Sequence, residues 1–312
     1  MISSLKYCLA VTVLVAACAP SNASLDTAPL ATAAIDSVRL MHDIGVLAHD
    51  SMEGRLVGTP GNARARAFIE RSFRERGLQP AGSSSYLHPF DIQRDDATIE
   101  GVNIIGQVTG TAQPSQYIVV TAHYDHVGVR DGEIYNGADD NASGTAALLA
   151  LADYFTRNRP RHTLIFAALD AEEGGLRGAR AFVESPPVPL QSIVLNINMD
   201  MVGRNDAGEL YVAGTAHYPQ LLPFVEEVAR NAEVTLIPGH DRPGARPSDD
   251  WTTASDHAAF HRAGIPFLYF GVEDHPDYHR PTDEMSGIQP GFYPRAVRTV
   301  LSAVRLLDRE YR

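Results

Sequence analysis

The chain has 312 residues, of which 44% are hydrophobic and 21% are charged. This composition is typical of a globular protein, and the length is sufficient for a single domain with a large core. The formal net charge of -12 at pH 7 excludes nucleic acid and anionic lipid surfaces as the main partners.

The first 36 residues predict export. Lys6 precedes an apolar stretch that is too short to span a bilayer, which is typical of a signal peptide. The stretch ends in Val15-Ala16-Ala17-Cys18, which resembles the lipobox of bacterial lipoproteins. The resemblance implies a signal peptide over residues 1–17, a lipid on Cys18 that anchors the chain in the membrane, and a position on the periplasmic face of the outer membrane. The alternative is an ordinary signal peptide without an anchor.

Residues 18–36 are rich in Ala, Ser, Thr and Pro, which is typical of a flexible tether. The only other cysteine is Cys8, inside the predicted signal peptide. The mature chain would therefore contain one cysteine and no internal disulfide.

The remaining residues, 37–312, alternate between helical and strand patterns. The pattern predicts helices at residues 62–77, 142–155, 221–231 and 294–308. It predicts strands at residues 102–108, 117–122, 163–169, 193–198 and 265–271, so that helices and strands are interspersed along the chain. The order predicts an α/β fold: a single three-layer α/β/α domain with a mixed, mainly parallel central sheet.

Acidic and imidazole side chains follow four of these predicted strands. They lie at residues 123–125, 170–174, 199–201 and 274–283. Open parallel sheets bind ligands at the carboxyl ends of their strands, so we expect these four segments to meet in one crevice. Histidine nitrogens and carboxylate oxygens from separate elements are typical zinc ligands.

These segments together resemble the co-catalytic zinc exopeptidases of metallopeptidase family twenty-eight. The matching motifs are His123-Tyr124-Asp125, residues 137–144, Glu172-Glu173-Gly174, Asp200 and Tyr278-His279-Arg280-Pro281. The resemblance covers roughly residues 40–312, and its specificity comes from the order and spacing of all five motifs. It implies the zinc exopeptidase fold, two Zn²⁺ ions per chain and peptide substrates.

The resemblance also implies a role for each matching residue. One ion would bind His123 and Asp200, the other would bind Glu173 and His279, and Asp140 would bridge the two. Glu172 would be the general base, acting on a water between the metals. Asp125 would accept the second ring N–H of His123, and Tyr278 would donate a hydrogen bond to the oxyanion. The Asp140-Asn141 peptide would be cis, as in relatives.

Several assignments have alternatives within the sequence. Asp139 competes with Asp140 as the bridge, and His275 competes with His279 as a ligand. Asp283 would either support its loop or orient His279. Residues 255–257 would line the pocket without binding metal, and the loop at 237–253 is a candidate for shaping specificity.

The activity expected from the resemblance is removal of amino-terminal residues from peptides. Larger relatives carry an inserted domain that builds a glutamate pocket, whereas only about a dozen residues, 91–102, occupy that region here. This compact form favours an aminopeptidase over a glutamate carboxypeptidase. A glutaminyl cyclase with one zinc, another amidohydrolase and a non-catalytic binding module are the alternatives.

Overall fold

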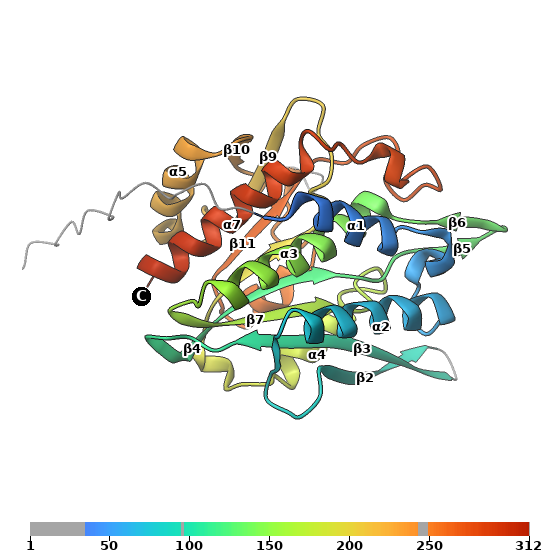
Figure 1. The fold of residues 1–312 in the computed structure, drawn as a ribbon, viewed down its shortest axis with the longest axis horizontal. Coiled ribbons are helices and arrows are strands. Elements are labelled where there is room, and N and C mark those ends of the chain that lie inside the picture. Colours follow the sequence, from blue (N-terminus) through green and yellow to red (C-terminus); the bar gives the residue numbers. More distant parts are fainter. Residues whose placement is uncertain (1–34, 95–96, 243–248, 312) are drawn as a thin grey trace, which may run out of the picture.

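The computed structural model describes residues 35–94, 97–242 and 249–311. The predicted signal peptide, Cys18 and nearly all of the predicted tether lie outside these residues. A central sheet crosses the described part of the chain, with helices on both faces (Figure 1). The α/β fold predicted from the sequence is therefore confirmed.

Among the residues that the structure describes, the sheet has nine strands, and its middle is parallel. Along the sheet the order is β1 (Gln79–Pro80), β3 (Ala97–Val108), β7 (His162–Leu169), β4 (Gln113–His123), β8 (Ile193–Met199), β11 (Phe267–Gly271), β9 (Glu209–Ala213) and β10 (Thr235–Pro238). The remaining strand, β2 (Leu87–Arg94), pairs only with β3. The parallel neighbours β7, β4, β8 and β11 carry the predicted site segments at their carboxyl ends.

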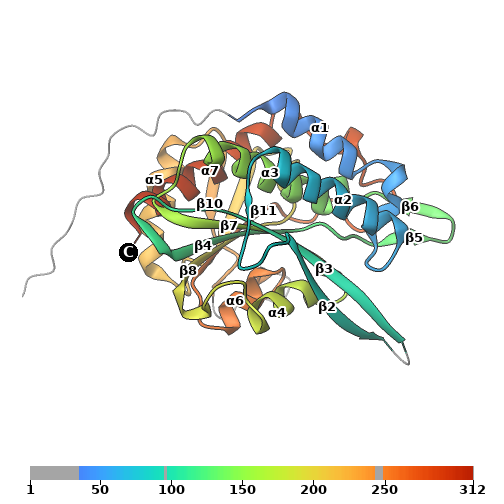
Figure 2. The ribbon, with the colours of Figure 1, turned by 60° about the horizontal axis from the view of Figure 1, so that its bottom comes forward.

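In the described ranges, five helices cover one face of the sheet and two cover the other, and Figure 2 shows the two layers on opposite sides. The larger layer contains α1 (Ser37–Leu47), α2 (Pro60–Glu75), α3 (Gly144–Arg157), α5 (Leu222–Asn231) and α7 (Tyr293–Glu310). The smaller layer contains α4 (Arg177–Glu184) and α6 (His257–Arg262). This is the three-layer arrangement expected for a mainly parallel sheet.

The middle strands are apolar on both sides because both of their faces are covered. In β7, Phe166 packs into the core under the five-helix layer, whereas the adjacent Ile165 packs into the core under α4 and α6. In β4, Val120 and Val119 divide in the same way. Successive side chains of these strands therefore lie in opposite cores, and a continuous run of apolar residues stabilises both cores.

Two parts of the sheet were not expected from the sequence. β2 and the long β3 form a hairpin that projects from the body of the molecule (Figure 2), where only a strand at 102–108 was predicted. The other unexpected part is the pair β9 and β10 at the opposite edge of the sheet. Apart from this sheet, β5 (Gly128–Arg130) and β6 (Glu133–Tyr135) form a separate two-stranded ribbon.

Within the described ranges, no helix combines the length and apolarity that crossing a bilayer would require.

Candidate metal centre

The carboxyl ends of the parallel strands bring the predicted site segments together. β4 ends at His123, and β8 ends one residue before Asp200. Backbone hydrogen bonds continue past the strands, from Tyr124 to Leu169 at 2.9 Å and from Asp200 to Phe270 at 3.1 Å. The side chains that follow the strands are therefore held at one edge of the sheet.

A first cluster contains His123, Asp140 and Asp200. The His123 Nε2 atom lies 3.2 Å from Asp200 Oδ1 and 3.4 Å from Asp140 Oδ1. All three side chains are buried. A carboxylate oxygen of Glu172 lies within 4.8 Å of donor atoms of His123 and Asp200.

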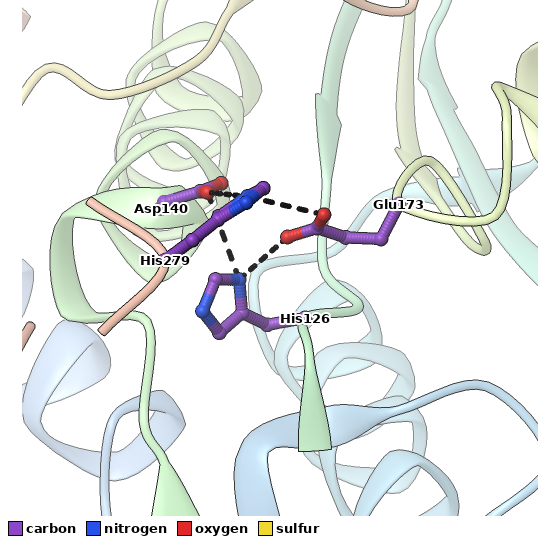
Figure 3. Close-up of side chains that lie close together, drawn as sticks. All are labelled: His126, Asp140, Glu173 and His279. Atoms are coloured by element: carbon purple, nitrogen blue, oxygen red, sulfur yellow. Dashed lines mark ion pairs between the residues drawn. The ribbon is translucent and has the colours of Figure 1, made fainter. Parts of the chain in front are cut away.

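A second cluster contains Asp140, Glu173 and His279 (Figure 3). His279 Nε2 lies 3.0 Å from Asp140 Oδ2 and 3.1 Å from Glu173 Oε2. Asp140 thus presents one oxygen to each cluster. The five residues predicted as metal ligands are all brought together, with Asp140 in the shared position.

His126 is a member of the second cluster that was not predicted from the sequence. Its ring is fully buried, and Nδ1 lies 2.8 Å from Glu173 Oε1 and 3.7 Å from Asp140 Oδ2 (Figure 3). The available signal was its position three residues after His123, immediately beyond the matching motif. Strand periodicity could not place its side chain, because β4 has already ended at His123.

Asp283 fixes the backbone of the loop that carries Asp140. Its carboxylate accepts hydrogen bonds from the N–H groups of Asp139, at 3.0 and 3.1 Å, and of Asp140, at 3.0 Å. Burial raises the pKa of Asp283 to about 6. These contacts match neither of the two predicted roles, which were to support its own loop or to orient His279: the Asp283 carboxylate instead supports the loop at residues 139–140.

The competing candidates Asp139 and His275 pair with each other outside the two clusters. Asp139 accepts a 2.7 Å hydrogen bond from the Gly203 N–H, and its other oxygen lies 3.1 Å from His275 Nε2. The Asp140-Asn141 peptide bond is cis, as the resemblance implied. It lies within a short π-helical segment, Ala138–Ser143, directly before α3.

Asp125 makes its main contacts to the glutamate turn. Its carboxylate accepts hydrogen bonds from the backbone N–H groups of Glu172, at 2.9 Å, and Glu173, at 3.4 Å. His123 Nδ1 lies closer to the Asp125 carbonyl oxygen, at 3.2 Å, than to its carboxylate, at 3.7 Å. Asp125 therefore lies beside His123 as expected, but its carboxylate chiefly holds the turn that carries Glu172 and Glu173.

Glu172 lies in a low-dielectric and strongly acidic environment. Burial raises its pKa well above the ordinary value, the His123 imidazole opposes this, and the negative charges of Asp200 and Asp256 add to it. For Glu173, burial acts in the same direction, but close contacts with the imidazoles of His126 and His279 hold the pKa below its ordinary value. The two neighbouring glutamates therefore differ in their proton affinity, which is typical of functional sites.

The segment 255–257, predicted as pocket wall, borders the first cluster. Asp256 is fully buried, and both of its carboxylate oxygens are without a hydrogen-bond partner among the described residues. Burial raises the pKa of Asp256 to about 8 and lowers that of His257 to about 4. Neither residue belongs to a potential ligand cluster in the described part of the chain.

Tyr278 stacks on the ring of His279, with 4.0 Å between ring centroids and 22° between ring planes. Burial raises its pKa, so the hydroxyl keeps its proton at neutral pH. Its placement next to a cluster residue is compatible with hydrogen-bond donation to a group at the centre.

Arg55 is a buried cation behind both clusters. Its guanidinium donates to the carbonyl oxygens of Leu47 at 2.8 Å, Tyr124 at 2.7 Å, Asn136 at 2.6 Å and Gly137 at 2.9 Å. Burial lowers its pKa to about 10, so it remains charged at neutral pH. The Gly54-Arg55 segment thus packs beneath the site.

The two clusters have the chemistry of a zinc-binding centre. Four ligand atoms at zinc bond lengths of about 2.0–2.1 Å would lie about 3.3 Å from one another in a tetrahedron. The His–carboxylate separations among the five predicted ligands range from 3.0 to 3.4 Å. Buried carboxylates and imidazoles at this density require cationic partners, and the donor set therefore fits two metal ions.

A cavity of about 250 Å³ adjoins the second cluster. Asp125 and Glu173 form part of its lining, and Leu56, Ile99 and Val127 provide apolar surface. The β2–β3 hairpin therefore contributes a wall beside the centre through Ile99.

Residues 103–304 match the model of peptidase family M28. The chain belongs to peptidase family M28. Among curated proteins, it is 33% identical over 199 residues to the aminopeptidase YwaD of Bacillus subtilis, a match that covers 60% of this chain and 40% of YwaD. The chain spans less than half of the length of YwaD and of the first curated relatives that it matches.

Solved structures share the fold of this M28 family member at low sequence identity. A zinc aminopeptidase from Bacillus subtilis superposes with a TM-score of 0.69 at 20% identity, covering 87% of this chain and 95% of that one. A glutaminyl cyclase from an Acidobacteriales bacterium superposes with a TM-score of 0.74 at 21% identity, covering 90% and 98%. Because both activities occur on this fold, the choice between them depends on the site.

Proposed function

We propose that this chain is a two-metal aminopeptidase that removes residues from the amino end of peptides. The observation that carries the proposal is the position of Asp140, whose Oδ1 faces His123 at 3.4 Å while its Oδ2 faces His279 at 3.0 Å. A carboxylate shared in this way suits two adjacent ions rather than one. His123 and Asp200 would complete one site, and Glu173 and His279 the other.

When bound, the two ions would acidify a water and polarise the scissile carbonyl. Glu172 would accept the proton of the attacking water and deliver it to the amine that leaves as the C–N bond breaks. Its raised pKa suits both steps, because a base of very low pKa binds the transferred proton too weakly. Tyr278, protonated at neutral pH, would donate a hydrogen bond to the charge that develops on the carbonyl oxygen.

The surrounding carboxylates favour a substrate that carries a free α-ammonium group. Asp256 lies buried beside the first cluster with neither oxygen hydrogen-bonded among the described residues, and Asp200 and Glu172 are its acidic neighbours. The cavity beside Glu173 offers apolar surface for a side chain of the peptide. These features support action at the amino terminus.

Hydrolysis of amino-acid p-nitroanilides and short peptides tests this function. The expected result is release of the amino-terminal residue, lost on chelation, restored by Zn²⁺, and blocked when the α-amine is acetylated. Equal activity on free and acetylated substrates would overturn the aminopeptidase assignment, and activity that persists after complete metal removal would overturn the mechanism.

Glutaminyl cyclase is the second candidate, supported by fold similarity to such enzymes. The sequence-based distinction is that cyclases of this fold use one zinc, whereas this chain has a histidine and carboxylates in each of two clusters. Incubation of glutaminyl peptides, with mass spectrometry for loss of ammonia, separates the two activities. Pyroglutamate formation with one zinc per chain would favour the cyclase.

We also propose that the chain is exported and anchored by a lipid on Cys18. The lipobox-like sequence Val15-Ala16-Ala17-Cys18 supports this proposal. Metabolic labelling with palmitate in a bacterial host should label the wild type but not Cys18→Ser. Labelling that is unchanged in Cys18→Ser, or undetectable in a correctly processed wild type, would contradict the anchor.

A further inference from the structure

We propose that His126 is a fourth protein ligand of the second metal site, which it joins through Nδ1 together with Asp140, Glu173 and His279. This inference rests on the proposed two-metal function and adds a ligand to the five expected from the motifs. It makes the two sites unequal, with four protein donors at one and His123, Asp140 and Asp200 at the other.

The positions of the donor atoms are the first observation that supports this inference. His126 Nδ1 lies 2.8 Å from Glu173 Oε1 and 3.7 Å from Asp140 Oδ2, while His279 Nε2 closes the same group at 3.0 and 3.1 Å. These separations bracket the value of about 3.3 Å expected between ligands of a tetrahedral zinc ion. One donor atom from each of the four side chains lies within 4.8 Å of all the others (Figure 3).

The lack of hydrogen bonds at His126 is the second observation. Both ring nitrogens are buried, and neither has a hydrogen-bond partner among the described residues. Although Nδ1 and Glu173 Oε1 are close, their alignment does not make a hydrogen bond, and Oε1 likewise has no hydrogen-bond partner in the described part of the chain. Two buried polar atoms that face a common point without bonding to each other are costly unless a third atom binds both.

The backbone around His126 holds the ring in this orientation. Gly137 has a φ of +53°, and a Cβ at this position would collide with the His126 ring and the Asp140 carbonyl. The Arg55 guanidinium bonds the carbonyl of the same glycine at 2.9 Å. The ring is therefore packed in place before any ion binds, which reduces the entropic cost of ligation.

Unequal sites have a consequence for metal loading. A site with four protein donors resembles a closed structural zinc site, whereas three protein donors leave a position open for water or substrate. We therefore expect the ion at His126, Asp140, Glu173 and His279 to bind more tightly. The ion at His123 and Asp200 would be lost first on mild chelation.

The test compares His126→Asn with wild type in zinc titrations against a chromophoric chelator. An asparagine amide reaches the position of Nδ1 and is polar enough to replace it beside Glu173, but it is a poor zinc ligand. His279→Asn shows how much zinc affinity is lost when a predicted ligand is removed. His162→Asn, at a buried histidine paired with Asp308 at the start of β7, is the control for removing an imidazole elsewhere.

If His126 is a ligand, His126→Asn weakens the tighter zinc site by more than about 100-fold, beyond the 10–100-fold typical of a residue that only hydrogen-bonds a ligand. The tighter site should weaken similarly in His279→Asn and stay unchanged in His162→Asn. Wild-type affinity in a folded His126→Asn protein would overturn the proposal, as would any loss of less than about 100-fold.

X-ray absorption of the zinc-loaded wild type gives a second readout that does not depend on a variant. Three imidazoles per two zinc ions are expected, whereas two imidazoles would overturn the assignment. Failure of the proposed two-metal function can be told apart from failure of the His126 assignment, because in that case the wild type itself would bind fewer than two ions or leave peptides intact. Wild-type hydrolysis with two ions but only two imidazoles would refute His126 alone.

Discussion

The Nε atom of Arg55 donates a 2.7 Å hydrogen bond to the backbone carbonyl of Tyr124. Tyr124 lies between two residues of the site, and the other donors of the same guanidinium hold the segment that leads to Asp140. One fully buried side chain thus connects the segments that carry the two sets of ligands. Its charge also faces several buried carboxylates at long range.

Arg55→Met should lower the free energy of unfolding of the metal-free protein by about 3 kcal/mol or more, because four buried carbonyl groups lose their donor. Urea denaturation measures the change. Arg64→Met is the control, since Arg64 is 43% exposed and its ion pair with Glu53 contributes at most about 1 kcal/mol. Equal effects of the two substitutions would contradict the role of Arg55.

Asp283→Asn should weaken zinc binding by about 10–100-fold, the range found when a residue that supports a ligand is replaced. The amide directs an N–H group toward the backbone N–H groups that the carboxylate now binds, which displaces the Asp140 loop. Chelator competition measures the affinity. Unchanged affinity in the folded variant would show that the loop does not need this carboxylate.

Glu172→Gln should reduce kcat by about 10²–10⁴-fold while both metal ions remain bound. The amide is nearly the same size but cannot accept the proton of the water. Steady-state kinetics, together with metal analysis of the same preparation, give the result. Full activity would identify another residue as the base, and loss of metal would place Glu172 among the ligands.

The acidic limb of the profile of kcat/KM against pH should lie above the ordinary pKa of a glutamate, 4.5, because burial raises the pKa of Glu172. A general base acts in its ionised form, so activity rises as pH rises through this pKa. Asp256→Asn removes a neighbouring negative charge that adds to the shift, and it should move the limb to lower pH. A move to higher pH would contradict this electrostatic assignment.

Removal of metal should lower the midpoint of thermal unfolding. Asp140, Glu173 and Asp200 are gathered in a small volume, and without cations their mutual repulsion opposes folding. Zinc at 100 times its dissociation constant would add about 2.7 kcal/mol to the free energy of unfolding. Scanning fluorimetry with and without chelator measures the difference, and coincident curves would show that the native state does not bind the ions.

The predictable part of the molecule was the part where local sequence and burial agree. The runs of apolar residues at 163–169 and 193–198 correspond to β7 and β8, because strands covered on both faces need side chains of one kind. The positions of His123 and Asp200 followed from the polarity of parallel strands. β2 was missed because it lies at the edge and contains Pro89, a residue that argues against a strand in other positions.

The finer contacts of the site depend on side-chain directions that residue order does not determine. From the sequence, the Asp125 carboxylate was predicted to accept a hydrogen bond from His123. In the structure it accepts hydrogen bonds from the backbone N–H groups of Glu172 and Glu173. His126 was overlooked because a histidine beyond the end of a strand can point in any direction. Only the turn of the chain after β4 decides that its Nδ1 faces Glu173.

His279 is the last of the cluster residues along the chain, and it lies on a loop beyond β11, the final strand. A truncated polypeptide that ends before this loop could build most of the sheet, yet it would lack one of the imidazoles around Asp140. We therefore expect peptidase activity to appear only after the loop that carries His279 has been synthesised. Premature termination or proteolytic nicking upstream of this point would yield an inert fragment rather than a poorly controlled protease.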